Sequence, residues 1–229
     1  AGREDAASPL QAVVEAPDFG AEHLQTLRTL LDLGADVHAR NAGGRSALLF
    51  AVDRNRTDAA ALLLEKGANA NVADRNGIFP LLSASCSGNA ELVSLLADRG
   101  ADMKMALPDG WTPLMCAAQG GHLAAAGKLL ERGAPVNMRM PEGVTALTRA
   151  ERTGNLDMVK TLLAHGADPV VAYIPESFSA LKGRAVAVNA KKKRLGDVLE
   201  RIAAAASQDG YRFSHDPSLG KKISCSVRT

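Results

Sequence analysis

Residues 110–134 read GWTPLMCAAQGGHLAAAGKLLERGA, and this stretch decides the fold because it is one unit of a repeat. Its closing Gly-Ala pair recurs at a fixed interval of 33 residues, beginning at Gly34, Gly67, Gly100, Gly133 and Gly166. A constant period of this length is typical of a solenoid, in which each unit buries its apolar face only by stacking on its neighbours. The pattern therefore predicts an extended surface rather than a catalytic pocket.

The residue types in each part of the unit suit a particular structural role. The Thr112 hydroxyl can cap a first helix, and Pro113 suits the first helical position because its missing N–H costs nothing there. Gly121 is placed to end that helix in a left-handed conformation, and Gly133 to end a second helix in the same way. Leu129 is predicted to face the core from the second helix. The unit is therefore expected to be two helices followed by a projecting hairpin, or finger.

The Thr-Pro-Leu run at 112–114 and the period resemble the ankyrin repeat, and the resemblance covers residues 8–170. It implies a mainly α fold: a solenoid of five helix-turn-helix repeats with hairpin fingers. The first unit is longer between its helices, around residues 17–20. The histidine of the family's T-P-L-H motif is absent everywhere, which leaves its hydrogen bonds between units in doubt; the residues in its place are Leu49, Leu82, Met115 and Thr148.

The same resemblance implies that the fingers and first helices line one concave face that binds a protein partner. Framework positions repeat along the chain, whereas surface positions differ from unit to unit. The predicted partner-binding residues are the variable residues after the framework glycine and the apolar residues of the fingers: Arg45, Ile78, Trp111, Val144, Met105, Leu107, Met138 and Met140. Trp111 is the only tryptophan, and Trp is enriched at binding hot spots. The alternative is that these apolar residues bury one another between fingers.

Composition and motifs indicate a binding protein rather than an enzyme. The chain is 46% hydrophobic but only 3% aromatic, so Ala and Leu fill the core. No HExxH motif, phosphate-cradling glycine loop or nucleophile motif occurs, and no catalytic residue, metal site or cofactor is predicted. Cys86, Cys116 and Cys225 have no metal spacing and are interpreted as small buried hydrophobes outside any disulfide framework. His122 is interpreted as a structural residue at a capping position.

The last quarter of the chain differs from the rest in charge and in pattern. Residues 1–174 hold 16 Lys and Arg against 20 Asp and Glu, whereas residues 175–229 hold 11 against 5. With prolines at 169 and 175, this shift predicts a repeat domain over 1–170 and a linker over 171–182. Beyond the linker, alternation and helical spacing predict a strand at 185–189, a helix at about 195–207, and strands at 211–214 and 223–227.

This order of elements resembles the short N-terminal domain shared by secretins and TonB-dependent transporters. The matching features within 183–229 are a Leu-x-x-Val-Leu helix start, a Gly-aromatic strand and an Asp-Pro turn; the second helix of the family is missing, so the domain is expected to be truncated. The resemblance implies docking to a bacterial envelope secretion, pilus or transport assembly. The basic run of Lys191, Lys192, Lys193 and Arg194 is expected in a solvated turn or against an acidic partner or anionic lipid; nothing nearby favours nucleic acid.

Three functional hypotheses follow from these patterns. The first is a non-catalytic scaffold that binds a protein on its repeats and docks through its C-terminal segment. The second is an inhibitor or immunity protein of the ankyrin type that occludes an enzyme. An enzyme is the third, and no residue constellation supports it. A periplasmic location is expected from the second resemblance, with the cytoplasm as the alternative; removal of a signal peptide would explain a chain that starts at Ala1. No stretch of about 18–20 apolar residues suits a membrane span.

Overall fold

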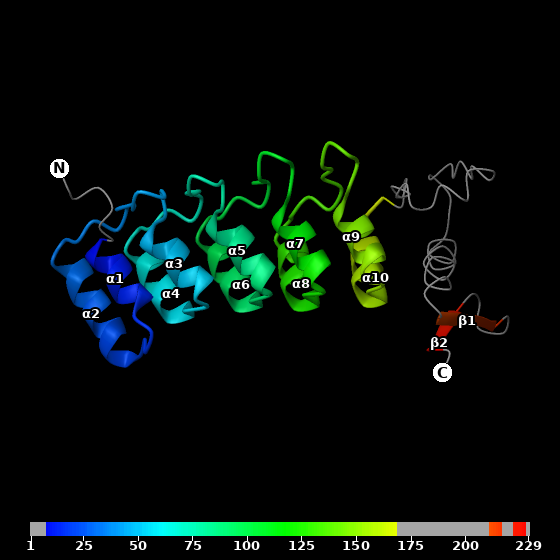
Figure 1. The fold of residues 1–229 in the computed structure, drawn as a ribbon, viewed down its shortest axis with the longest axis horizontal. Coiled ribbons are helices and arrows are strands. Elements are labelled where there is room, and N and C mark those ends of the chain that lie inside the picture. The colour runs from blue at the N-terminus through cyan, green and yellow to red at the C-terminus, as the bar shows by residue number, and fades with distance from the viewer. Residues whose placement is uncertain (1–7, 169–210, 217–221, 228–229) are drawn as a thin grey trace.

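The computed structural model describes residues 8–168, 211–216 and 222–227. Figure 1 shows the first range as a row of paired helices with loops projecting along one edge. The helices are α1 (Pro9–Glu15), α2 (Ala21–Asp32), α3 (Ala47–Asp53), α4 (Thr57–Glu65), α5 (Pro80–Ser87), α6 (Ala90–Asp98), α7 (Pro113–Gly120), α8 (Leu123–Glu131), α9 (Ala146–Arg152) and α10 (Leu156–Ala164). The predicted helical solenoid of five units is confirmed.

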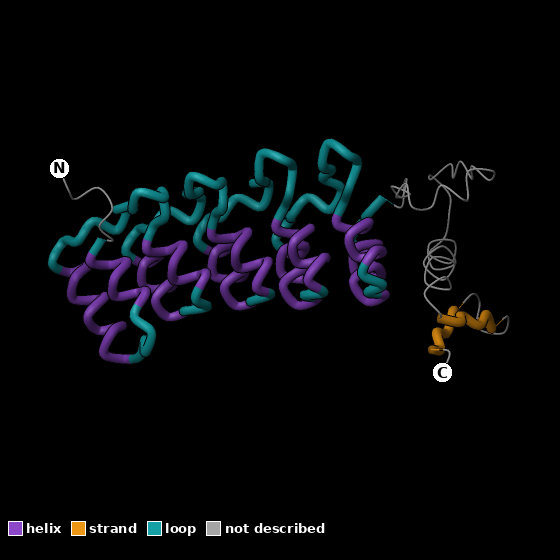
Figure 2. Tube along the Cα trace, in the orientation of Figure 1, coloured by secondary structure: helices purple, strands orange, loops and turns teal. Residues whose placement is uncertain are grey.

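The helices form two layers. The first helices of the units, α1, α3, α5, α7 and α9, pack against one another in sequence, and the second helices do the same behind them. Figure 2 shows the fingers as long loops that all rise from the same edge of the helices. The core between the layers consists mainly of Ala and Leu; Leu63, Leu96 and Leu129 are fully buried at the same position of successive units. Residues that recur at the 33-residue period of the sequence therefore occupy equivalent places in the core.

The ends of the helices match the capping chemistry expected from the sequence. Thr112 caps α7 by accepting a hydrogen bond from the Met115 N–H at 3.2 Å. Gly121 then ends α7 with a left-handed φ of 70°. Asn55 takes the equivalent left-handed place after α3 with a φ of 53°, and asparagine tolerates this conformation better than most residues. The first helices of units 2 to 5 therefore end after seven or eight residues, and these units keep the same length.

Asparagine side chains tie neighbouring fingers together at the base. The Asn71 amide donates to the Gly100 carbonyl at 2.9 Å and accepts from the Asp102 N–H at 2.7 Å. Asn137 repeats this arrangement, with 3.0 Å to the Gly166 carbonyl and 2.7 Å from the Asp168 N–H. Each amide thus satisfies backbone groups of the next unit, so the fingers are held in register.

The first unit is longer than the others, as expected, and it joins the stack in its own way. Five residues separate α1 from α2, and α2 has 12 residues where the other second helices have nine. Gln11 is fully buried and occupies the place of the family's histidine. Its amide donates to the carbonyls of Arg45 at 2.7 Å and Ala39 at 3.4 Å. The hydrogen bonds between units that were in doubt therefore exist at this first junction, through glutamine.

The described part of the C-terminal region is a hairpin of two antiparallel strands, β1 (Tyr211–Asp216) and β2 (Lys222–Val227). Tyr211 pairs with Val227, and Asp216 pairs with Lys222. The two strands lie where alternation predicted them. The predicted linker at 171–182, strand at 185–189, helix at about 195–207 and basic run at 191–194 lie outside the described residues. A complete α/β domain is therefore not established by the structure and stays a proposal.

We expect Gly88→Ala to destabilise the chain more than Gly67→Ala. Both glycines are left-handed, with φ of 74° and 91°, so either alanine costs about 1–2 kcal/mol in backbone strain. A Cβ at Gly67 meets nothing within 4 Å, whereas at Gly88 it collides with the His122 ring. That overlap adds about 1–3 kcal/mol. Urea unfolding followed by circular dichroism measures both variants, and equal losses would contradict this close packing.

Candidate partner-binding surface

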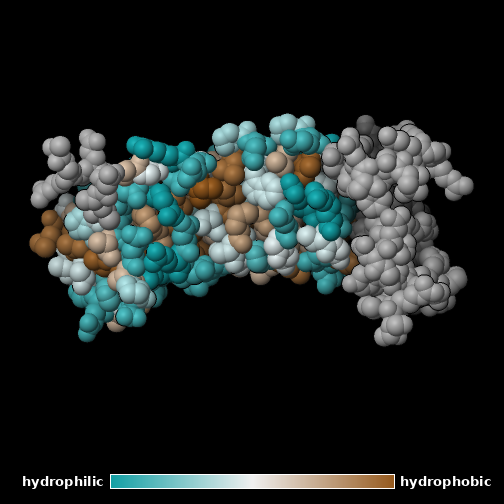
Figure 3. Space-filling model, viewed as in Figure 1, coloured by the Kyte–Doolittle hydropathy of each residue, from teal (hydrophilic) through white to brown (hydrophobic). Residues whose placement is uncertain are grey.

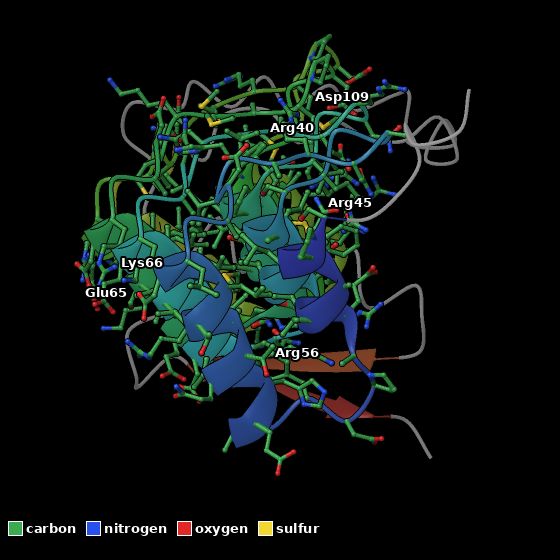
Figure 4. The ribbon with its side chains drawn as sticks, turned by 90° about the vertical axis from the view of Figure 1, so that its left-hand side faces the viewer. Arg40, Arg45, Arg56, Glu65, Lys66 and Asp109 are labelled. Carbon is green, nitrogen blue, oxygen red and sulfur yellow. A yellow bond between two sulfur atoms is a disulfide. The ribbon has the colours of Figure 1, made fainter. Side chains whose placement is uncertain are left out.

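We define the first-helix face by three positions in each unit: the residue after the finger glycine, and the fourth and seventh residues of the first helix. In units 2 to 5 these residues are Arg45, Phe50, Asp53, Ile78, Ser83, Cys86, Trp111, Cys116, Gln119, Val144, Arg149 and Arg152. Figure 4 shows Arg45 on one side of the stack and Glu65 and Lys66 of the second-helix layer on the other. The side that carries Arg45 faces the viewer in Figure 3, where apolar surface gathers between the fingers and the helices.

At its N-terminal end, the first-helix face carries an arginine whose charge is balanced by its neighbours, although its buried Nε has no hydrogen-bond partner within the described residues. Arg45 forms an ion pair with Asp53, and its Nε lies 3.8 Å from Asp74 Oδ2 in the next finger. Its guanidinium also lies over the Phe50 ring, 4.3 Å from the centroid. Asp53 in turn accepts a hydrogen bond from the Ser83 hydroxyl of the next unit. Charge is therefore balanced locally, and Phe50 is buried beneath the arginine with 6% exposed.

A disulfide joins units 3 and 4 at the centre of the face. Cys86 and Cys116 are bonded with their Cα atoms 4.9 Å apart, although 30 residues separate them in sequence. Cys86 is exposed and Cys116 half-buried. The interpretation of these cysteines as buried thiols without a disulfide was wrong. The seventh residue of one first helix lies against the fourth residue of the next, as Asp53 does against Ser83, and this offset brings the two sulfur atoms together.

At the C-terminal end, an aromatic ring and a guanidinium meet across two units. The Arg149 guanidinium lies over the Trp111 ring, 4.3 Å from the centroid, and its Nη2 lies 3.6 Å from Met140 Sδ. Burial lowers the pKa of Arg149, and the positive charge of nearby Arg152 lowers it further, while Glu142 acts in the opposite direction. This end of the face is therefore cationic and partly desolvated.

The other predicted partner-binding residues divide by exposure. Ile78, Met105, Leu107, Trp111, Met138 and Met140 are partly buried and pack against the core, so each keeps part of its surface outside. Each of these side chains therefore combines contact with the core and an accessible remainder. Val144 is buried with only 7% exposed, so this valine offers the least surface of the set. Lys191, Lys192, Lys193 and Arg194 lie outside the described residues.

His122 lies at the centre of the stack and has a structural partner. It stands at the N-cap of α8 without a side-chain capping bond, and its Nε2 lies 3.1 Å from the Cys86 carbonyl. The asparagines at the equivalent positions, Asn89 and Asn155, do cap their helices. Within the described residues, no three His, Cys, Asp or Glu side chains are grouped so that they could hold a metal.

Reasoning from the sequence missed three residues that shape this face: Cys86, Cys116 and Arg149. A comparison of first-helix positions seven and four between adjacent units would have found the disulfide. It would not have found the contact of Arg149 with Trp111, which joins position four to the residue after the finger glycine of the preceding unit. In the described part of the chain, no helix is long and apolar enough to cross a membrane.

Comparison with known proteins identifies the repeat region. The family model for ankyrin repeats in three copies matches residues 15–106 and, overlapping this range, residues 84–172. The two matches together span more than half of the chain. No curated protein is significantly similar to the chain as a whole.

Proposed function

This chain belongs to the ankyrin-repeat family, and we propose that it is a non-catalytic scaffold that binds a partner protein on its first-helix face and fingers. Ankyrin repeats imply a role in protein–protein interaction. The observation that carries the proposed location is the line of unlike residues along this face: a balanced Arg45 cluster, a central disulfide and a cationic Trp111–Arg149 pair.

The partly exposed apolar residues of this face suit the centre of an interface. Ile78, Leu107 and Trp111 belong to units 3 and 4 and keep part of their surface outside the core. Aromatic and Met side chains are enriched at protein interfaces, and a few such residues usually carry most of the binding energy. Trp111 is therefore the proposed anchor, with the arginine beside it providing specificity.

The disulfide favours an oxidising compartment. Disulfides persist in secreted and periplasmic proteins and are rare in the cytosol of mesophiles. Cys86 is exposed, which would leave this bond open to cellular reductants. We therefore propose the bacterial periplasm, with the cytoplasm as the alternative. In this proposal, residues 183–229, whose β1–β2 hairpin the structure describes, form a separate docking domain for an envelope assembly after a linker at 171–182.

An inhibitor or immunity protein that occludes an enzyme is the second candidate. The same exposed surface would serve it, because an inhibitor also needs a large contact area without chemistry of its own. The two candidates are distinguished by the identity of the partner. If the partner is an enzyme whose activity falls in proportion to the amount of chain added, the inhibitor role is favoured.

The experiment that tests the scaffold proposal is affinity capture with the full chain, followed by mass spectrometry. We expect a partner that binds the native chain and Leu123→Ala but binds Trp111→Ala about 30-fold more weakly, the loss typical of a hot-spot residue. Leu123 is a matched control because its side chain is 41% exposed on α8, outside the first-helix face. Equal binding of the partner to both variants would place the interface elsewhere, and the absence of any specific partner would refute the scaffold role.

A further inference from the structure

Two arginines of the first-helix face lie over aromatic rings, but their surroundings differ. Arg45 lies over Phe50 and has two carboxylates beside it, Asp53 at the seventh position of α3, which begins two residues after Arg45, and Asp74 in the next finger. Arg149 lies over Trp111 at the same distance of 4.3 Å. At Arg45, two carboxylates balance the charge of an arginine that is stacked on an aromatic ring.

The second pair has the arginine and the ring exchanged: Arg149 stands at the fourth helix position, where α3 has Phe50, and Trp111 stands after the finger glycine, where unit 2 has Arg45. The seventh position of its helix is Arg152 where α3 has Asp53, and the finger position is Met140 where the earlier finger has Asp74. The matching backbone bonds, from Asp74 N–H to the Ile78 carbonyl and from Met140 N–H to the Val144 carbonyl, establish that equivalence of the fingers. Arg149 thus has a sulfur atom and a second cation where Arg45 has two anions.

The hydrogen-bonding capacity of Arg149 is incompletely used. Its Nε is buried and has no hydrogen-bond partner within the described residues, which is also true of Arg45 Nε, but no carboxylate among those residues forms an ion pair with the Arg149 guanidinium. A partly desolvated guanidinium presents a rigid fork of donors that matches a carboxylate. Burial lowers the pKa of Arg149 and the charge of Arg152 lowers it further, while Glu142 acts in the opposite direction, so an added anion would favour the cationic form of the guanidinium.

We propose that the Arg149–Arg152 pair is a binding site for a carboxylate of the partner, supplied by an Asp or Glu in an acidic peptide segment that lies along the first-helix face. The carboxylate takes the place that Asp53 and Asp74 take at Arg45. Trp111 holds the guanidinium in position from below, and the apolar side chains of Ile78 and Leu107 continue the surface toward the middle of the stack. The proposal rests on the scaffold function and specifies the chemistry of its partner.

The test is selection of short random peptides displayed on phage against the immobilised full chain. We expect enriched peptides to contain Asp or Glu together with an apolar residue. The strongest peptide is then synthesised in two forms, with its acidic residue as Glu or as Gln, and its affinity is measured by fluorescence anisotropy. Replacing Glu by Gln should weaken binding to the native chain at least about tenfold, the loss expected for a charge-assisted hydrogen bond. The same replacement should change binding to Arg149→Gln hardly at all.

Two further variants keep the result interpretable. Arg152→Gln removes only an exposed charge and should weaken the Glu peptide without affecting the fold, which protects the test if Arg149→Gln unfolds. Arg99→Gln, at the end of α6 in the second-helix layer, is the control and should bind the Glu peptide normally. Enrichment of neutral or basic peptides that still require Trp111 would overturn the carboxylate site and leave the scaffold role intact. Failure to enrich any peptide would overturn the carboxylate site, whereas the scaffold role would still be judged by capture of a partner.

Discussion

Reduction of the Cys86–Cys116 disulfide is expected to lower the free energy of unfolding by about 3–4 kcal/mol. The bond closes a loop of 30 residues, and closing a loop of this size removes chain entropy from the unfolded state by that amount. The disulfide also joins α5 to α7, so it holds units 3 and 4 together at the centre of the stack. Urea melts of the full chain with and without a phosphine reductant measure the change.

Variants at the cysteines separate loss of the bond from other effects of the reductant. A double variant with Cys86→Ser and Cys116→Ser should be as unstable as the reduced native chain and insensitive to reductant. Cys225→Ser should keep the full response, because Cys225 lies in β2 and takes no part in the bond. If a thiol assay finds three reactive cysteines in the oxidised native chain, or if the two native melts coincide, the disulfide is absent in solution.

The framework of the fold was predictable because its determinants repeat. A cap such as Thr112, a left-handed glycine such as Gly121 and a core leucine such as Leu129 each act within one unit, so their spacing is visible in the sequence. Contacts between units are different, since they join unlike positions; the disulfide, for example, joins the seventh position of one first helix to the fourth of the next. Cys86 and Cys116 are 30 residues apart, so a search for residues that recur at the 33-residue period does not pair them.

At the candidate surface, the partial exposure of some residues was predictable from the sequence, but their contacts were not. The variable position after the finger glycine correctly marked Arg45 and Trp111 as neighbours of the surface. Their partners could not be inferred from that position, because Asp74 approaches Arg45 from the next finger and Arg149 approaches Trp111 from the next unit. Val144 differs from Arg45 and Trp111: it occupies the same position after the finger glycine, where exposure was expected, but it is only 7% exposed.

The second large effect is expected for Leu129→Ala, which should cost about 2–5 kcal/mol of unfolding free energy. Leu129 is fully buried in α8, in the row of core leucines that includes Leu96 and Leu162 from the neighbouring units. Truncation removes its apolar contacts and leaves a cavity that Ala-rich surroundings, such as Ala125 and Ala126, are too short to fill. Since each unit is stabilised by its neighbours, the loss should be felt by the whole stack.

Leu123→Ala is the matched control for this prediction, because it makes the same chemical change in the same helix at a side chain that is 41% exposed. We expect it to change stability by no more than about 0.5 kcal/mol, as is usual for surface substitutions. Comparing the two variants by urea unfolding cancels the effect of helix propensity, which both share. Similar losses for the two would mean that the second-helix core face is misassigned. Leu129 was assigned to the core from the period of the sequence alone. That outcome would therefore also contradict the claim that residues at the same position of each unit pack in the same way.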